Sequence, residues 1–545
     1  MITTKLVLII TIIKLKIVLS QTQNAILTVY LNKSTTWENK ELYSGFTKLN
    51  NNSTLEVDCV NLNSNISYVI FQAHSHLYNI TLYNNTYVYG SYVKGTNVGL
   101  YSSIKPTIDT FFVMNSNAID LDVYISIHGY SAKDPIPGGC NAEFSVPISP
   151  FLQTKYNKDY VLVDAGFPQD ILDKNCNSLE RVRVAFYQMY IYERNFSKEA
   201  YFDGIQKMMT MEYISDNGVF IPDNGLNMRR MLSAYPGTGS IYVAVAFSVA
   251  NKSAYSVYVP TVTYACSPLE ENGCVIFDDA LSQLLCASLL FIGTFICYFG
   301  HRFFKTEMFL VGLASGGIVT FILISLIADL NRPALLGASL LCGICFGSMW
   351  LLFYWLYGIP LVSVFLATLN VGFLFSALIY HGLPGGHRAL EDDANFWTLF
   401  IVLMLLTSLV LVSMTFVSNI LCCSLLGAYA AVYPIDYYLG SNLKYIIINT
   451  VRRAVVPNFN HAVLSPPFEW RDSLVTLLCV GLAISGFLVQ HYQNYGRPPF
   501  PPPPRSVRPV PVTIYGATVP STERRPVTSR NSRSRVITER TALLA

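Results

Sequence analysis

Hydrophobic and polar residues alternate along the first half of the chain. In the segment IDLDVYISI, Ile119, Leu121 and Val123 fall on one face and the polar residues between them on the other. The segment IYVAVAFSV, residues 241–249, has the same period of two. Because successive side chains of a strand point to opposite faces, both segments predict strands that bury one face against another sheet. The other elements expected here are strands at 67–72, 181–192 and 255–264 and a helical insertion near 198–213.

We predict that residues 21–279 form a β-rich ectodomain of antiparallel strands on the lumenal or extracellular side of a membrane. Each half of this region closes with an alternating strand, a polar turn and a cysteine, Cys140 or Cys266. This repeat is compatible with two sandwiches in tandem, at about 21–140 and 141–266. The alternative is a single irregular β domain.

The second half of the chain is a series of long apolar runs. Each run is long enough to cross a hydrocarbon core of about 30 Å, so residues 280–491 predict a helical seven-transmembrane domain. Residues 492–545, rich in Pro and Arg, predict a disordered tail. The runs lie at about 280–300, 308–328, 334–356, 359–380, 396–417, 419–440 and 473–491.

Small residues recur at four-residue spacing inside several runs. Such residues let helices approach closely, although ordinary small residues within spans would give the same pattern. The residues are Gly312 and Gly316, then Ser339, Gly343 and Gly347, and finally Cys423, Gly427 and Ala431.

The two ends of the chain predict its orientation. Residues 1–20 have an early Lys5 and a short apolar stretch broken by Lys14 and Lys16, which favours a cleaved signal peptide over an uncleaved anchor. Seven crossings then leave the C-terminus in the cytosol. Glycosylation sequons agree, because all of them precede the first run. They begin at Asn32, Asn51, Asn52, Asn65, Asn79, Asn84, Asn195 and Asn251.

One loop conflicts with the positive-inside rule. The loop 441–472 carries Lys444, Arg452, Arg453 and Arg471, yet this topology places it outside. We predict that YIIINTVRRAVV, residues 445–456, lies in the membrane interface with its Arg pair reaching lipid headgroups.

The composition supports a membrane protein. The chain is 52% hydrophobic and 13% charged, against about 25% charged residues in soluble domains. Its net charge of +3 is too small to suggest a nucleic-acid partner. Membrane lipid is therefore the first expected partner.

Five cysteines precede the first run, and an oxidising compartment favours their pairing. Cys266 and Cys274 are eight residues apart around a loop with Pro and Gly, so a local disulfide is expected. Cys59 with Cys140 is the second pairing considered. Because five is an odd number, one of these cysteines cannot pair with another of the five. The five are Cys59, Cys140, Cys176, Cys266 and Cys274.

Asp436 is the exception among spans that otherwise lack charge. Intramembrane carboxylates are usually functional, which allows a channel or transporter with Asp436 at its mouth. Asp436 lies near the predicted end of its run, however, so an interfacial carboxylate is the simpler interpretation. The histidines form no metal-site pattern and no nucleophile–base motif is evident, so we expect neither a cofactor nor an enzyme. The short connection near Ser418 and the missing receptor signatures disfavour a G-protein-coupled receptor.

The tail contains two candidate recognition sequences. Phe500 followed by four prolines has the form that EVH1 domains bind, although a stiff spacer would look the same. Glu539, three residues and then Leu543–Leu544 match the acidic dileucine signal that clathrin adaptors read. We predict a sorting motif here, and chance is the alternative. The prolines are Pro501, Pro502, Pro503 and Pro504.

Several short segments resemble the transmembrane 7 superfamily member 3 family. They are DPIPGGCN at 134–141, TYACS at 263–267, FGHRFFKTEMF at 299–309, GRPPFPP at 496–502 and ERTALL at 539–544. The resemblance implies a glycosylated protein with a signal peptide and seven spans. It also implies a role in cell survival and in damping endoplasmic-reticulum stress, without a known ligand or enzymatic activity.

The sequence therefore predicts a non-enzymatic multi-pass membrane glycoprotein. Its ectodomain binds an unidentified ligand, and its tail directs traffic among the plasma membrane, endosomes and lysosomes. The alternative is a channel or transporter formed by the helices.

Overall fold

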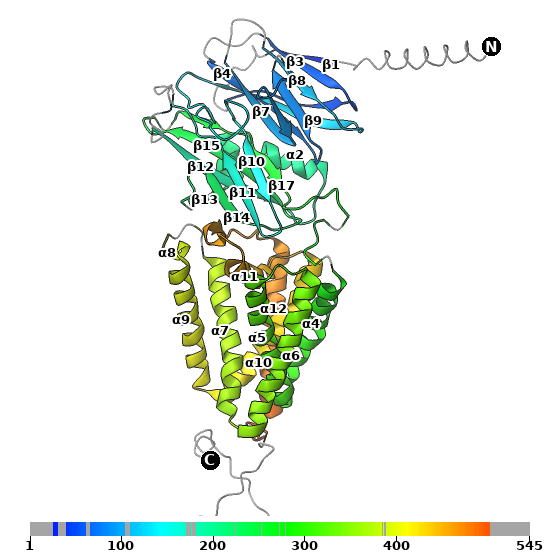
Figure 1. Cartoon of the computed structure of the whole chain (residues 1–545), viewed down its shortest axis with the longest axis vertical. Helices are drawn as coiled ribbons and strands as arrows, with labels where there is room; N and C mark the ends of the chain where they lie inside the picture. The colour runs from blue at the N-terminus through cyan, green and yellow to red at the C-terminus, as the bar shows by residue number, and fades with distance from the viewer. Residues whose placement is uncertain are drawn as a thin grey trace, which may run out of the picture. The chain divides into compact units, whose positions relative to one another are not determined.

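The computed structural model describes residues 25–30, 40–60, 66–84, 86–103, 109–170, 176, 181–223, 225–251, 253–271, 273–277, 279–383, 385 and 388–501. The chain divides into two compact units (Figure 1). The first unit comprises Met1–Ala280, Ala377–Leu399 and Asp436–Ser473. The second comprises Leu281–Ser376, Phe400–Ile435 and Leu474–Ala545. The first unit thus combines the strands with short segments from much later in the chain.

Two sheets form the first sandwich of the first unit. One sheet has the order β1–β3–β8–β5–β6, with β1 and β3 parallel, and the other has the order β2–β9–β4–β7. The strands are β1 (Ala25–Tyr30), β2 (Glu41–Leu49), β3 (Thr54–Val60), β4 (Tyr68–Ser75), β5 (Ile80–Asn84), β6 (Tyr92–Gly95), β7 (Asn97–Ser103), β8 (Asp109–Met114) and β9 (Leu121–Tyr130).

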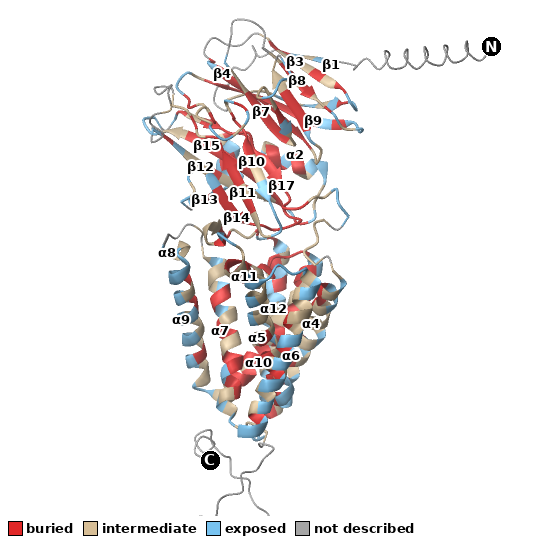
Figure 2. Ribbon diagram, in the orientation of Figure 1, coloured by how far each residue is buried: buried red, intermediate tan, exposed pale blue. Residues whose placement is uncertain are grey.

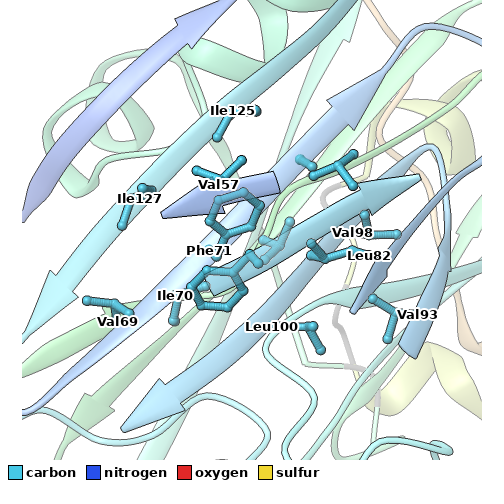
Figure 3. Packing of buried hydrophobic residues seen from close by; sticks show 14 of the residues in the cluster. Val57, Val69, Ile70, Phe71, Leu82, Val93, Val98, Leu100, Ile125 and Ile127 are labelled. Carbon is cyan, nitrogen blue, oxygen red and sulfur yellow. The ribbon is translucent and has the colours of Figure 1, made fainter. Parts of the chain in front are cut away.

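Apolar side chains from both sheets form the core of this sandwich. Phe71 of β4 stacks on Phe111 of β8 with ring centroids 4.5 Å apart, which joins the two sheets. Figure 3 shows Phe71 among other buried residues, including Val57 and Ile125. Burying this apolar surface is the main force that holds the sandwich together.

A second sandwich follows, again built from two sheets. One has the order β10–β11–β14–β18, and the other has the order β13–β12–β15–β16, with β17 also paired to β15. Two tandem sandwiches are therefore present, rather than one irregular domain. The strands are β10 (Leu152–Tyr156), β11 (Tyr160–Ala165), β12 (Val182–Ile191), β13 (Val219–Ile221), β14 (Arg229–Ser233), β15 (Gly239–Ser248), β16 (Tyr255–Val257), β17 (Thr261–Thr263) and β18 (Ala462–Val463).

The helical insertion consists of two short helices, α2 (Lys198–Gln206) and α3 (Met211–Asn217). Ser197 and Thr210 cap their N-termini by accepting hydrogen bonds from backbone N–H groups of the first turns. The buried residues of α2 include Tyr201 and Phe202, which pack in a cluster with Ile241 and Val243 of β15. The predicted insertion is confirmed, although as two helices.

Two of the predicted strands are buried on both faces, not on one. Tyr242 and Ala244 of β15 pack toward β11 and β14, and Ile241 packs toward α2. On β9, Tyr124 and Ser126 lie on the opposite face from Val123, and both are buried. The second face is buried as well because further layers of the first unit cover these strands.

A polar network fills part of this covered face of the first sandwich. His74 and His128 are fully buried there, with Gln72 donating to His128 Nδ1 at 3.2 Å. Asn97 Oδ1 lies 2.9 Å from His74 Nδ1 and accepts from the hydroxyl of Tyr201 in α2 at 3.0 Å. Hydrogen bonds therefore link the first sandwich to the helical insertion of the second.

Two disulfides are present among the described residues, Cys140–Cys176 and Cys266–Cys274. The local bridge predicted for Cys266 and Cys274 is confirmed. The pairing of Cys59 with Cys140 was wrong, because Cys59 lies inside β3 and is buried in the core of the first sandwich. A thiol in that position behaves as a small apolar side chain.

Seven helices of the described chain are long and apolar enough to cross a membrane. The spans predicted from the sequence correspond to them one for one. They are α4 (Ala280–Phe299), α5 (Phe304–Ile327) with the short η3 (His301–Phe303) before it, α6 (Arg332–Tyr357), α7 (Pro360–Gly382), α9 (Asp393–Val412), α10 (Thr415–Leu439) and α12 (Trp470–Asn494). The short helix α8 (Arg388–Glu391) precedes α9.

Glycines bring some of these helices into close contact within the second unit. A Cβ added to Gly312 of α5 would lie 2.8 Å from Gly347 Cα of α6, and one added to Gly343 would lie 2.7 Å from Leu313 O. The predicted small-residue packing is thus present at these positions. Other helix faces stay exposed although they are apolar (Figure 2), as expected for surfaces that contact lipid.

We predict that acidic pH destabilises the first sandwich through His74 and His128. Burial lowers the pKa of each histidine from 6.5 to about 4, and the hydrogen bond with Asn97 offsets this only in part for His74. Between pH 7 and pH 5 the unfolded chain binds protons at these positions while the folded chain does not, so stability falls. The loss is about 2 kcal/mol per histidine.

Thermal unfolding of the purified chain at pH 7 and pH 5 measures this effect. The double variant His74→Gln/His128→Gln should show a smaller loss between the two pH values than the wild type. Equal losses in both proteins would contradict the prediction.

Candidate functional site

The segment between α10 and α12, residues 440–469, folds as part of the first unit. It contains α11 (Tyr445–Val455), η4 (Phe459–His461) and β18. β18 pairs in parallel with β14 through Met231↔Ala462 and Leu232↔Val463. Val463 is part of the core between the two sheets of the second sandwich. We call residues 440–469 the returning segment, because it completes a sandwich that began more than 200 residues earlier.

Arg452 of the returning segment is buried against the second sandwich. Its Nη1 donates to Ala234 O at 2.8 Å and its Nε to Asp159 at 3.2 Å. The Nη1 and Nη2 groups of the same side chain also donate to Ser233 Oγ and Lys158 O, respectively. These hydrogen bonds offset the free-energy cost of removing the charged guanidinium group from water.

Arg453 is buried as well and has different partners. It donates to Leu390 O at 3.0 Å, pairs with Asp393 at 2.8 Å and lies over the ring of Phe396. The prediction that this Arg pair reaches lipid headgroups was therefore wrong. The sequence pattern of α11 is amphipathic, but protein acceptors rather than lipid cover its basic face.

Next to α11 lies a group of buried charges that we call the acidic cluster. It comprises four carboxylates and one ammonium group, which pairs with two of them. Lys444 Nζ is 3.7 Å from Glu193 Oε2 and 3.8 Å from Asp436 Oδ2. The members are Glu193, Asp436, Lys444, Glu469 and Asp472.

Asp436 is fully buried and well supplied with donors. Its carboxylate accepts from Ser441 Oγ at 2.7 Å and from the backbone N–H groups of Leu443 and Lys444 at 2.8 and 2.9 Å. It thereby fixes the turn where α10 ends, and the interfacial position of this carboxylate stays a prediction. Asp472 does the same at the start of α12, accepting from the N–H groups of Asn442 and Glu469.

Glu193 and Glu469 are less completely satisfied. Glu469 Oε1 accepts from Glu193 N at 3.1 Å, but neither Glu193 Oε2 nor Glu469 Oε2 has a hydrogen-bond donor, although both are buried. Burial raises the pKa of Glu193, while Lys444 and Arg194 oppose that shift. Both residues line a cavity of about 500 Å³ in the first unit.

The structure describes six of the eight predicted glycosylation sites. Asn51, Asn52, Asn79 and Asn251 are exposed, whereas Asn84 and Asn195 are half-buried. In Asn195 and Asn251 the side-chain Oδ1 accepts from the hydroxyl of the serine two residues on. Asn32 and Asn65 lie outside the described residues. Glycosylation stays a prediction.

The start of the tail packs in the second unit. Phe500 contacts the rings of Phe304 and His301 at centroid distances of 5.3 and 5.7 Å, and Tyr354 donates to Pro501 O at 3.0 Å. A polyproline-binding domain would have to displace Phe500 from these contacts. The rest of that motif (Pro502, Pro503 and Pro504) and the sorting motif (Glu539, Leu543 and Leu544) lie outside the described residues.

The sequence analysis missed a second buried carboxylate. Glu307 of α5 accepts from Asn419 Nδ2 at 2.9 Å, and the same nitrogen lies 3.0 Å from His301 Nδ1. The second apolar run predicted from the sequence begins at residue 308, one residue after Glu307. The segment FGHRFFKTEMF, already noted as characteristic, contains both His301 and Glu307 and was the available signal. Polar groups of this kind hold membrane helices together.

The described chain is that of a multi-pass membrane protein with two β-sandwich domains and seven spans. Family models match in the same order: the TM7SF3-like, N-terminal immunoglobulin-like domain at residues 35–130, the TM7SF3-like, second immunoglobulin-like domain at 135–269 and the TM7S3/TM198-like domain at 286–491. Both sandwiches are thus immunoglobulin-like.

Curated relatives agree. Transmembrane 7 superfamily member 3 of Homo sapiens is 29% identical over 461 residues, which cover 81% of this chain and 80% of the human protein. The Mus musculus protein of the same name is 28% identical over 474 residues, 84% of each chain. The chain is therefore similar, along both sandwiches and the spans, to membrane proteins named transmembrane 7 superfamily member 3.

We predict that Lys444→Met strongly destabilises the first unit. The substitution removes the buried ammonium group that pairs with Glu193 and Asp436 and leaves Glu193 with only the exposed Arg194 at 3.9 Å, which costs about 3–5 kcal/mol. The matched control is Lys198→Met, which removes an exposed ion pair with Asp122 and costs about 0–1 kcal/mol. Thermal unfolding of the purified chains compares them.

The double variant Glu193→Gln/Lys444→Met tests the electrostatic cause. It should regain part of the lost stability, because one uncompensated charge is gone. A Lys444→Met protein as stable as Lys198→Met would show that the ion pairs contribute little.

Proposed function

We propose that the protein is a non-enzymatic membrane glycoprotein that senses a ligand with its immunoglobulin-like domains. The single observation that supports this proposal is the returning segment. It gives β18 to the second sandwich, and its first and last residues adjoin the ends of α10 and α12. A ligand that alters the second sandwich would therefore act directly on the ends of two membrane spans.

We further propose that this signal serves cell survival by damping endoplasmic-reticulum stress. The resemblance to that family supports this role, and the ligand is unidentified. The channel or transporter alternative is less well supported, since every donor to Asp436 comes from the protein itself and its carboxylate anchors a turn.

The proposed topology places the immunoglobulin-like domains outside the cell or in the lumen and the tail in the cytosol. The exposed sequons at Asn51, Asn79 and Asn251 support this orientation. In the cytosol, Glu539, Leu543 and Leu544 would bind a clathrin adaptor and hold the protein in endosomes and lysosomes as well as at the plasma membrane. An EVH1 partner at Phe500 is a weaker proposal because of the packing of that ring.

We predict that Asp159→Asn weakens stress protection. Asp159 pairs with Arg452 but is itself 44% exposed, so the variant loosens the contact with α11 at small cost in stability. In cells that lack the protein, the wild type should lower a stress reporter after inhibition of the endoplasmic-reticulum calcium pump, and Asp159→Asn should lower it less.

The matched control for that experiment is Asp216→Asn, an exposed acidic residue of α3. It should protect as well as the wild type at equal expression. If wild type fails to lower the reporter, the stress role is wrong. If all three proteins protect equally, the contact with α11 is not part of the signal.

We predict that Leu543→Ala/Leu544→Ala increases the amount of protein at the cell surface several-fold, because the adaptor loses its apolar contacts. Antibody binding to a tag placed after the signal peptide on unpermeabilised cells measures this. The matched control is Val510→Ala/Val512→Ala, which removes apolar groups from the tail outside the motif.

A second tag at the C-terminus tests the topology in the same cells. It should stain only after permeabilisation. Unchanged surface levels would remove the sorting proposal, and staining of the C-terminal tag on intact cells would remove the proposed orientation.

A further inference from the structure

The cavity beside the acidic cluster has features of a ligand site. Its volume is about 500 Å³, and all of its lining residues belong to the first unit. They come from the loop after β12, the last residue of α10 and the start of α12. The residues are Tyr192, Glu193, Arg194, Asn195, Leu439, Glu469, Trp470 and Arg471.

The buried wall of the cavity carries two carboxylates, those of Glu193 and Glu469. Glu193 pairs with Lys444 at 3.7 Å and with Arg194 at 3.9 Å. Asp436 and Asp472 are satisfied by backbone donors, whereas Glu193 and Glu469 each retain one carboxylate oxygen without a donor. Both glutamates are only 8% exposed. Buried carboxylate oxygens without donors favour a cationic ligand.

The rim of the cavity adds two other kinds of group. Arg194 and Arg471 donate to carbonyl groups at the end of α10, at Tyr438 and Leu439, and each guanidinium has further N–H donors. Tyr192 and Trp470 are 62% and 66% exposed. Aromatic faces attract quaternary ammonium groups, and guanidinium groups bind phosphate.

The cavity adjoins the ends of two candidate membrane spans. Leu439 ends one span and Trp470 begins another. Near them, Tyr438 and Phe468 are exposed large hydrophobic residues. Aromatic side chains are enriched where a span meets the headgroup region. A lipid therefore reaches this cavity more readily than a dilute soluble molecule.

We propose that this cavity binds the zwitterionic headgroup of a phospholipid, with the ammonium group at Glu193 and Glu469 and the phosphate at Arg194 and Arg471. Phosphatidylcholine fits best, because its quaternary ammonium group suits the two aromatic rings. The proposal is independent of the ligand that the immunoglobulin-like domains sense.

The experiment measures the thermal unfolding midpoint of the purified full chain in detergent as phosphatidylcholine is added. The lipid should raise the midpoint, because it binds the folded state only. Phosphatidylglycerol has the phosphate but no ammonium group, so it should give no such rise. Equal stabilisation by both lipids would overturn the proposal.

Variants test the two ends of the headgroup. Glu469→Gln and Arg471→Gln should each raise the half-saturating phosphatidylcholine concentration by about tenfold. Arg471 is at the exposed rim, so its variant folds even if Glu469→Gln does not. Glu271→Gln, an exposed acidic residue away from the cavity, should respond as the wild type does. A wild-type response from Arg471→Gln would overturn the phosphate assignment.

Two further measurements identify the molecule that binds in the cavity. Soluble phosphocholine at the same concentrations should not stabilise the chain; if it does so with the same dependence on Arg471, the site binds a free zwitterion and not a lipid. Enzymatic removal of N-linked sugars from the purified chain should leave the response unchanged. If phosphatidylcholine stabilises only the chain without sugars, a sugar on Asn195 fills the cavity and the lipid assignment is wrong.

Discussion

The ion pairs of Lys444 with Glu193 and Asp436 are the interaction on which the first unit depends. Lys444 directly precedes α11, Asp436 lies in the last turn of α10 and Glu193 follows β12, so one ammonium group joins the returning segment and the end of α10 to the second sandwich. With these charges paired, α11 can lie on the second sandwich and β18 can pair with β14. A buried cation with fewer partners would not offset the cost of leaving water.

Much of the architecture could be predicted because it follows from local patterns. The seven spans are long apolar runs, and strands such as β9 and β15 have a clear period of two. Cys266 and Cys274 are close enough in sequence to suggest their bridge. In each case the residues that carry the signal are neighbours along the chain.

The rest could not be predicted because it depends on contacts between distant residues. Arg452 looks like a membrane-surface residue until the acceptors at Lys158, Asp159 and Ala234 are known. The same is true of β18, whose two residues form a strand only because β14 offers an edge. Asp436 was noticed for its charge, but its role as a turn anchor comes from backbone donors that no pattern shows.

The position of β18 in the chain also sets an order of events during synthesis. β14 is complete at Ser233, but its partner strand starts at Ala462, after six of the seven spans. At about 5–20 residues per second, the ribosome needs roughly 10–50 s to make the intervening chain. Until then the edge of β14 is an unpaired template for other strands. Chaperones that cover such edges would therefore be needed until the sixth span is inserted, and a fragment that ends at residue 279 would keep this exposed edge permanently.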